Sequence, residues 1–456
     1  MVKKGERITG KIEIILENGT GVLKHKGESF LVRNAIKDEV VEIEVEKKIK
    51  EGYASKLIQI KTPSSTRVKP LCPYYEKCGS CHLLHMKYEA QLQMKKQMII
   101  DMLKKERMGN IKVHDCVGMD SPYAYRNKII ISFGKNKKET VAGFYGEYSH
   151  QIVPIKNCLL HEDKVNKLIE DLKLIVKKCR IEVYDEDRGQ GFLRHILIRR
   201  GVISDETMVV LVGAEKVFKA KNNFVKALRD MHPEINTIVF NYNPRRTSVV
   251  LGSEEQVLYG KGFIEDELCS KRFKISSKSF YQINHEQCEK LYGKALSLLH
   301  LQGNETAIDA YCGVGTIGLI ASKQFKQVYG VEINSDAIKD AIENAKKNHI
   351  RNVRFTCDDA GKFMVNKAKE NERIDTVIMD PARDGSDEKF LSSLVKMNPK
   401  QVVYISCNPQ TQIRDIKYLE RFGYNTKEMY IYDLFPHTFH IESIVLLTKR
   451  KDNKRK

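Results

Sequence analysis

A cysteine stands where a strand is predicted to end, within residues 404–409, Tyr-Ile-Ser-Cys-Asn-Pro. Residues 401–405 are mostly apolar and predict a buried strand, and Asn408-Pro409 ends it because proline has no N–H for the ladder. Open α/β sheets bind their ligands at the carboxyl ends of their strands. Cys407 is therefore a candidate nucleophile, and an inert, half-buried thiol is an equally weighted alternative on this stretch alone.

A second group of cysteines has the spacing of a metal site. Cys72, Cys78 and Cys81 lie within ten residues, and Gly79 allows the chain to turn between the last two. A tetrahedral site needs a fourth ligand, for which the candidates are His82, His85 and Cys158. Zinc accepts three thiolates with one imidazole, or four thiolates, whereas an iron–sulfur cluster requires four thiolates. The spacing alone leaves both metals open.

A glycine-rich loop indicates a nucleotide-like ligand. The apolar strand predicted at residues 306–311 leads into Gly313, Gly315 and Gly318, which fit G-x-G-x-x-G before a helix. Glu332 ends the next predicted strand, where a carboxylate can accept hydrogen bonds from both ribose hydroxyls. This combination fits NAD and S-adenosylmethionine equally well.

Two further acidic residues favour S-adenosylmethionine. Asp309 lies within the first strand, just before the glycine loop, and Asp380-Pro381 closes the fourth predicted strand, where methyl donor and target approach each other. A dehydrogenase would also need a hydride-transfer site, for which the sequence offers no convincing candidate. We therefore expect a methyltransferase.

A methyl donor beside a thiol predicts methylation at a pyrimidine carbon. C5 of uracil is a poor nucleophile, but addition of a thiolate to C6 makes C5 enolate-like, so that it can attack the donor's methyl group. A base must then remove the C5 proton. Glu442, at the start of a predicted strand, is the candidate base, and His437 and His440 are alternatives. The competing interpretation is a polar loop that merely precedes a core strand.

Composition bounds the class of protein. The chain has 456 residues, with 78 Lys and Arg against 59 Asp and Glu, and this net charge of +19 favours a polyanionic partner such as RNA. Its 11 cysteines are an odd number without a signal peptide, which argues against a disulfide framework. No apolar run approaches the ~20 residues of a membrane span. We expect a soluble, cytoplasmic protein with no membrane partner.

The elements that must position these residues fall into three parts. Short strands at even spacing in residues 1–60 predict a five-stranded barrel of the OB type, a fold that often binds RNA. Residues 86–106 predict a helix with an apolar stripe at Leu92, Ile99, Met102 and Leu103. A mixed α/β region covers residues 111–270, and strands alternate with helices from about residue 275.

Over nearly its whole length the sequence resembles the RNA (uracil-C5)-methyltransferases, which include 23S rRNA and tRNA enzymes. Ser406–Pro409 resembles the family's nucleophile motif, and residues 437–442 resemble its H-x-x-H-x-E stretch. The resemblance implies that Cys407 is the nucleophile and Glu442 the base. It also implies donor contacts and a [4Fe–4S] cluster. The implied donor residues are Gln282, Tyr311, Glu332 and Asp380, with Asp359 in addition, and the implied cluster ligands are Cys72, Cys78, Cys81 and Cys158.

The resulting expectation is a multidomain α/β protein. Residues 1–60 form a TRAM-like, OB-like β-barrel, residues 70–270 a central α+β region that holds the iron–sulfur site and binds RNA, and residues 275–456 a Rossmann-like, S-adenosylmethionine-dependent methyltransferase domain. The expected product is 5-methyluridine in RNA. The barrel and the four cysteines favour 23S rRNA, and tRNA is the alternative. One alternative is a non-catalytic rRNA-binding assembly factor, but the presence of both Cys407 and Glu442 argues against it. Another is a radical enzyme, but such enzymes hold their cluster with three cysteines, and the resemblance implies a fourth.

Overall fold

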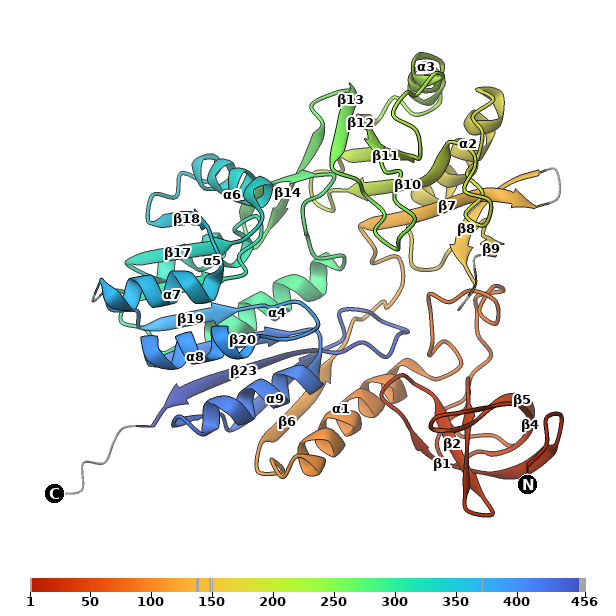
Figure 1. Cartoon of the computed structure of the whole chain (residues 1–456), viewed down its shortest axis with the longest axis horizontal. Helices are drawn as coiled ribbons and strands as arrows, with labels where there is room; N and C mark the ends of the chain where they lie inside the picture. The colour runs from red at the N-terminus through yellow and green to blue at the C-terminus, as the bar shows by residue number, and fades with distance from the viewer. Residues whose placement is uncertain (1, 137–138, 147–148, 150, 371, 451–456) are drawn as a thin grey trace.

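The computed structural model describes residues 2–136, 139–146, 149, 151–370 and 372–450. Residue 1 of the predicted barrel and residues 451–456 of the predicted catalytic domain lie outside the described residues. Figure 1 shows a small barrel, an upper lobe and a larger catalytic lobe arranged around a common centre. No helix in the described part of the chain is long and apolar enough to cross a membrane.

The first part of the chain is the predicted five-stranded barrel, which the structure confirms. Its strands close in the order β1-β2-β3-β5-β4. Side chains alternate between the barrel interior and solvent along β3 and the first part of β4, and Ile12, Leu23, Phe30 and Ile43 are fully buried. The strands are β1 (Arg7–Ile15), β2 (Gly21–His25), β3 (Glu28–Val32), β4 (Val40–Ile49) and β5 (Gly52–Thr62).

A loop with the first three cysteines follows, and then α1 (Tyr88–Lys105) and β6 (Lys112–Val117). Although β6 lies early in the chain, it pairs in parallel with β22 (Glu428–Tyr432) near the C-terminus. Helix α1 packs against the same sheet, because Ile99 and Leu103 belong to its core. The catalytic sheet is therefore completed by a segment that is distant in sequence.

The upper lobe contains a seven-stranded sheet in the order β13-β12-β11-β10-β7-β8-β9. Its apolar core is shared with α2 (Asp163–Lys178) and α3 (Lys221–Met231). A hairpin of β14 (Phe263–Leu268) and β15 (Lys271–Ser276) follows. The strands of the sheet are β7 (Lys128–Asn136), β8 (Glu139–Tyr145), β9 (Ile152–Pro154), β10 (Leu193–Arg200), β11 (Thr207–Gly213), β12 (Ile235–Tyr242) and β13 (Glu254–Tyr259).

The catalytic lobe is a nine-stranded sheet in the order β18-β17-β16-β19-β20-β23-β22-β6, with β21 paired to β23. Strands β18 to β20 are parallel along this order, and β23 is antiparallel to β20. The chain order reverses between β16 and β19, which makes the carboxyl ends of these strands the expected ligand site. The remaining strands are β16 (Thr306–Ala310), β17 (Gln327–Glu332), β18 (Val353–Cys357), β19 (Thr376–Met379), β20 (Gln401–Ser406), β21 (Tyr424–Asn425) and β23 (Glu442–Lys449).

Helices cover both faces of this sheet, as an α/β fold requires. One core combines the sheet with α1, α7, α8 and α9, and the other combines it with α4, α5 and the β14–β15 hairpin. The methyltransferase fold predicted from the glycine loop is thereby confirmed. The helices are α4 (His285–Ser297), α5 (Thr316–Ala321) with the short 3₁₀ turn η1 (Ser322–Gln324), α6 (Ser335–Lys347), α7 (Ala360–Lys369), α8 (Glu388–Met397) and α9 (Pro409–Glu420).

Candidate active site

Cys407 lies in the tight turn between β20 and α9. The Ser406 hydroxyl donates to the Asn408 carbonyl at 3.0 Å and accepts the Asn408 N–H at 3.1 Å. Asn408 caps α9 by accepting the N–H of Gln410, and its amide donates to the Arg383 carbonyl at 2.9 Å. These bonds fix the backbone on both sides of a half-buried thiol. The predicted placement of Cys407 at the tip of a strand is correct.

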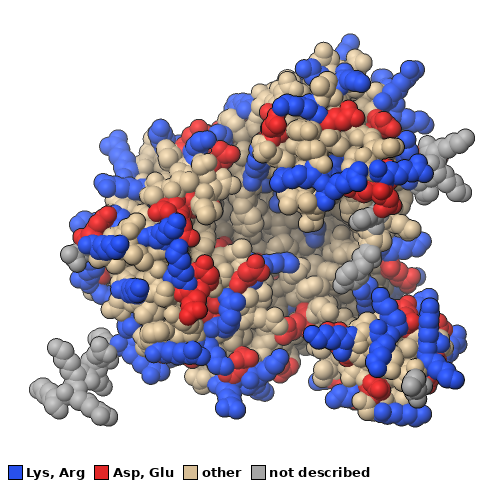
Figure 2. All heavy atoms as spheres, viewed as in Figure 1, with Lys and Arg blue, Asp and Glu red and all other residues tan. Residues whose placement is uncertain are grey.

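The thiol opens into a cavity of about 230 Å³ to which distant parts of the chain contribute. Met98 comes from α1, Arg383 from the loop after β19, and Phe439 and His440 from the loop before β23. Glu17 and Asn18 come from the β1–β2 turn of the barrel. Figure 2 shows that one face of the molecule is hollowed at its centre, with Lys and Arg side chains along the rim.

Two carboxyl groups, buried Glu442 and partly buried Asp380, lie close enough to Cys407 for their charges to act on its thiol. Glu442 begins β23, the antiparallel neighbour of β20, and Asp380 directly follows β19. Burial, with the Asp380 charge in addition, raises the pKa of Glu442 well above its usual range, while the Arg383 guanidinium lowers it. Burial raises the pKa of Asp380 to about 7. These carboxyl groups can therefore hold protons near neutral pH.

The pKa of the Cys407 thiol is also raised. Burial raises the pKa of Cys407 to about 11, the charges of Glu442 and Asp380 raise it further, and Arg383 opposes them. Cys407, Glu442 and Asp380 therefore form one coupled group, with Arg383 as the cation that favours the ionised forms of Cys407 and Glu442. Sequence reasoning gave Arg383 no role, and its only signal was its place three residues after Asp380.

The glycine loop has the geometry of a ligand cradle. The Gly318 N–H donates to Asp309 at 2.7 Å, and the Gly313 N–H donates to Glu332 at 3.2 Å. Gly315 has φ +81°, and a Cβ there would lie 2.7 Å from the Phe355 ring. Glycine is thus required at position 315, both by the left-handed backbone and by the close approach of Phe355 from β18.

The other predicted donor residues lie around the same edge of the sheet. Tyr311 directly follows β16 and has φ +62°, and its hydroxyl is 3.4 Å from the Ser386 hydroxyl. Gln282 lies before α4 and is buried. Its side chain is hydrogen-bonded to Tyr292. Burial raises the pKa of Tyr292, and the Asp380 charge raises it further. Asp359 instead caps α7 by accepting the Lys362 N–H at 2.9 Å.

The two candidate histidines of the loop before β23 are in different surroundings. His437 is buried, stacks on Tyr123 at 4.9 Å and accepts the N–H groups of His82 and Leu83 at its carbonyl. It joins the cysteine loop to the catalytic lobe. His440 lines the Cys407 cavity, and burial, together with Arg383, lowers its pKa to about 3. His440 is therefore neutral at physiological pH.

Cys72, Cys78, Cys81 and Cys158 all line one small cavity in the structure. Burial raises the pKa of Cys81 to about 12 and that of Cys158 to about 11, and the neighbouring thiols of the cavity raise both pKa values further. Four thiols that line one cavity suit an iron–sulfur cluster in their chemistry, because such a cluster is held by four cysteine thiolates. Within the described residues, however, no group of three or more His, Cys, Asp or Glu is arranged to hold a single metal ion.

The two histidine candidates for the fourth ligand do not line this cavity. The Tyr75 hydroxyl is hydrogen-bonded to His85 Nδ1 at 2.6 Å, and the His82 ring packs on the Phe439 ring with ring centres 4.5 Å apart. Among the three candidates the geometry thus favours Cys158.

Comparison with known proteins finds related RNA methyltransferases. A family profile described as tRNA (Uracil-5-)-methyltransferase matches residues 87–450. An uncharacterized RNA methyltransferase of Bacillus cereus is 40% identical over 98% of both chains, and one of Staphylococcus aureus is 39% identical over 98% of both. The crystal structure of Pyrococcus abyssi tRNA (uracil-54, C5)-methyltransferase in complex with S-adenosyl-L-homocysteine superimposes with a TM-score of 0.78. It is 28% identical and covers 96% of this chain and 99% of its own.

The matched profile spans both the α1–β6 segment and the catalytic lobe, and the relatives extend over the barrel as well. The chain therefore belongs to the RNA (uracil-C5)-methyltransferase family and carries out S-adenosylmethionine-dependent methylation of uracil C5 in RNA.

Proposed function

We propose that this enzyme methylates a uridine of 23S rRNA through a covalent bond between Cys407 Sγ and uracil C6. The observation that carries the proposal is the convergence of Cys407, Glu442, Asp380 and Arg383 at one edge of the catalytic sheet. The cavity beside Cys407, of about 230 Å³, can admit an unstacked base. The proposed location is the cytoplasm.

The reaction begins when the Cys407 thiolate adds to C6, and the electron pair of the C5–C6 double bond moves toward C5. Arg383 assists because it favours the thiolate over the thiol. S-adenosylmethionine supplies the methyl group that C5 receives. The Glu442 carboxylate then takes the C5 proton, the C6–S bond breaks, and the double bond re-forms as the thiolate leaves. Burial makes Glu442 a stronger base once it is ionised.

The methyl donor is proposed to lie along the glycine loop. Glu332, at the end of β17, would accept hydrogen bonds from the ribose, and Tyr311, Gln282 and Asp380 would complete its surroundings. The Asp359 side chain already caps a helix, so we assign it to shaping the α7 end of the site.

Cys72, Cys78, Cys81 and Cys158 are proposed to hold a [4Fe–4S] cluster. The cluster would tie the loop before α1 to the upper lobe and aid RNA recognition through the structure that it stabilises. It has no part in the methyl transfer, so methylation should not depend on reduction of the cluster.

The choice of 23S rRNA rests on the TRAM-like barrel and the cysteine set. The second candidate is tRNA, because the Pyrococcus abyssi relative is named for a tRNA uracil. Mapping of 5-methyluridine in rRNA and tRNA, from cells with and without this protein, separates the two. Loss of a single rRNA site is expected, and loss confined to tRNA would overturn the rRNA assignment.

The covalent step is tested by Glu442→Gln. Without a base the C5 proton stays, so the variant should accumulate an enzyme–RNA adduct that survives denaturing gels. Cys407→Ala is the matched control and should form no adduct while it still binds S-adenosylhomocysteine. Full methylation by Cys407→Ala would refute the covalent mechanism.

A further inference from the structure

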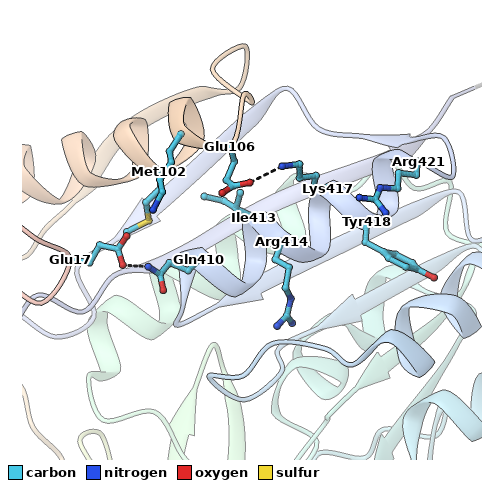
Figure 3. A pocket seen from close by; sticks show the side chains of 10 residues that line it. Glu17, Met102, Glu106, Gln410, Ile413, Arg414, Lys417, Tyr418 and Arg421 are labelled. Atoms are coloured by element: carbon cyan, nitrogen blue, oxygen red, sulfur yellow. Dashed lines mark hydrogen bonds and ion pairs between the residues drawn. The ribbon is translucent and has the colours of Figure 1, made fainter. Parts of the chain in front are cut away.

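A second hollow adjoins the Cys407 cavity on the outer side of the catalytic lobe. We name it the α1–α9 groove, because α1 forms one wall, α9 the other, and the β1–β2 turn of the barrel closes one end. Its volume is about 520 Å³ (Figure 3). Glu17, Met102 and Gln410 line both the groove and the Cys407 cavity. The two hollows therefore adjoin, with Glu17 and Gln410 between them.

Two exposed polar contacts cross the groove. Gln410 donates to the Glu17 carboxylate where the groove meets the cavity, and Lys417 pairs with Glu106 at 2.7 Å between α9 and α1, as the dashed lines in Figure 3 show. The Glu106 and Lys417 side chains are 43% and 45% exposed. Exposed pairs of this kind are weak, so an incoming polyanion can displace them.

The walls of the groove combine cationic rims with an apolar floor. Lys105, Arg414, Lys417 and Arg421 outnumber the two carboxylates, Glu17 and Glu106, and Met102, Ile413 and Tyr418 supply apolar surface. Cations for phosphates and aromatic or apolar faces for bases are the features of single-strand RNA sites.

The groove also has a suitable length and direction. Helix α9 begins two residues after Cys407 and has 12 residues, so it extends for about 18 Å from the catalytic edge of the sheet toward the opposite edge. A strand leaving the Cys407 cavity along α9 would thus meet Lys417 and then Arg421, whereas the Arg414 guanidinium is held by the Asp384 and Ser386 carbonyls.

We propose that the α1–α9 groove holds the single-stranded RNA that flanks the target uridine. The inference rests on the proposed function in placing the reacting uracil beside Cys407. The target base would occupy the Cys407 cavity, its neighbours would follow α9, and RNA entry would separate Glu17 from Gln410.

The test compares Lys105→Ala/Arg421→Ala with a matched control, Lys369→Ala/Arg351→Ala. Lys369 ends α7 and Arg351 precedes β18, so the control removes one Lys and one Arg from outside the groove. Affinity for a labelled single-stranded oligouridylate is measured by fluorescence anisotropy over a range of salt concentrations. The slope of log affinity against log salt should fall in magnitude by about 1.4 in the groove variant, at about 0.7 per lost phosphate contact. It should not change in the control.

Photocrosslinking with an oligouridylate that contains 4-thiouridine gives a local measurement. Crosslinks to peptides of α1 and α9 are expected in Cys407→Ala protein, and their loss is expected when the groove substitutions are added. Equal slopes in the groove and control variants, or crosslinks confined to the barrel and upper lobe, would overturn the proposal. Neither outcome depends on methylation, so failure of the groove is distinguishable from failure of the Cys407 mechanism.

Discussion

Cys407 lies in surroundings that oppose its ionisation. Burial and two neighbouring carboxyl groups raise its pKa to about 11, and Arg383 is the cation that counters them. The carboxyl groups share this property, since burial raises the pKa values of Glu442 and Asp380 as well. A proton gained by one member therefore eases the ionisation of another.

We predict that Arg383→Ala raises the pKa of Cys407. Because the thiolate is the reactive form, alkylation of Cys407 by iodoacetamide should be slower at every pH below that pKa, by about three- to tenfold for a shift of about half to one unit. Mass spectrometry of the Cys407 peptide across the neutral to alkaline range measures the profile. Arg383→Lys, which keeps the charge, should lie between wild type and Arg383→Ala. An unchanged profile in Arg383→Ala would contradict the role of the guanidinium.

At the scale of residues, the sequence predicted side chains whose chemistry is visible in a short motif. Cys407 and Glu442 are brought together at the catalytic edge as expected, and Asp380 lies beside them. Arg383 was missed because its effect depends on the convergence of β19, β20 and β23, which no local pattern reveals. His437 was a candidate base, yet its buried ring stacks on Tyr123 in a structural junction.

Among the elements, helix α1 shows where a periodic pattern succeeds and where it fails. The predicted helix at residues 86–106 is observed at Tyr88–Lys105, and Ile99 and Leu103 of the predicted stripe are buried. Lys95 is fully buried as well and pairs with Asp433 at 2.5 Å. A lysine is expected at the surface, and its partner lies 338 residues away, so the sequence offers no signal for this contact.

We predict that Lys95→Met lowers the free energy of unfolding by roughly 3–5 kcal/mol, because Asp433 is left buried without its cation. The double variant Lys95→Met/Asp433→Asn should recover much of this loss, since no charge then remains buried. Chemical denaturation of the wild type and both variants gives the values. Wild-type stability of Lys95→Met would show that the ion pair does not hold α1 to the sheet.

A second prediction at the scale of elements concerns the glycine loop. Gly315→Ala must place a Cβ against Phe355 at φ +81°, a strain of about 1–3 kcal/mol. Binding of S-adenosylhomocysteine, measured by calorimetry, should weaken by about tenfold. Gly293→Ala in α4 is the control, because a Cβ there meets nothing within 4 Å. If Gly315→Ala and Gly293→Ala bind S-adenosylhomocysteine equally well, the donor does not lie along the glycine loop.

In the whole molecule, the active site is assembled from segments at both ends of the chain. The barrel contributes Glu17, α1 contributes Met98, and the C-terminal part contributes Cys407 and His440. The sequence predicted the barrel, the cysteine loop and the methyltransferase fold, because each has a local pattern. It could not predict that β6 completes the catalytic sheet, since pairing between distant strands is set by packing rather than by local sequence.

The loop that holds Cys72, Cys78 and Cys81 contacts the loop before β23, which we call the catalytic loop. The N–H groups of His82 and Leu83, next to Cys81, donate to the His437 carbonyl at 2.8 and 3.0 Å. His437 lies in the loop that leads to Glu442. Loss of the cluster should therefore loosen the loop before the proposed base while the donor site, on the far side of β19, is preserved.

We predict that Cys81→Ser loses bound iron and speeds amide hydrogen exchange in residues 433–441, with little change in S-adenosylhomocysteine binding. Cys269→Ser is the control, because Cys269 is half-buried outside the four-cysteine cavity. Iron and sulfide analysis together with hydrogen-exchange mass spectrometry separate the two variants. If Cys81→Ser loses its iron while residues 433–441 exchange as in wild type, the cluster does not support the catalytic loop. If Cys81→Ser keeps a full complement of iron, Cys81 is not a ligand.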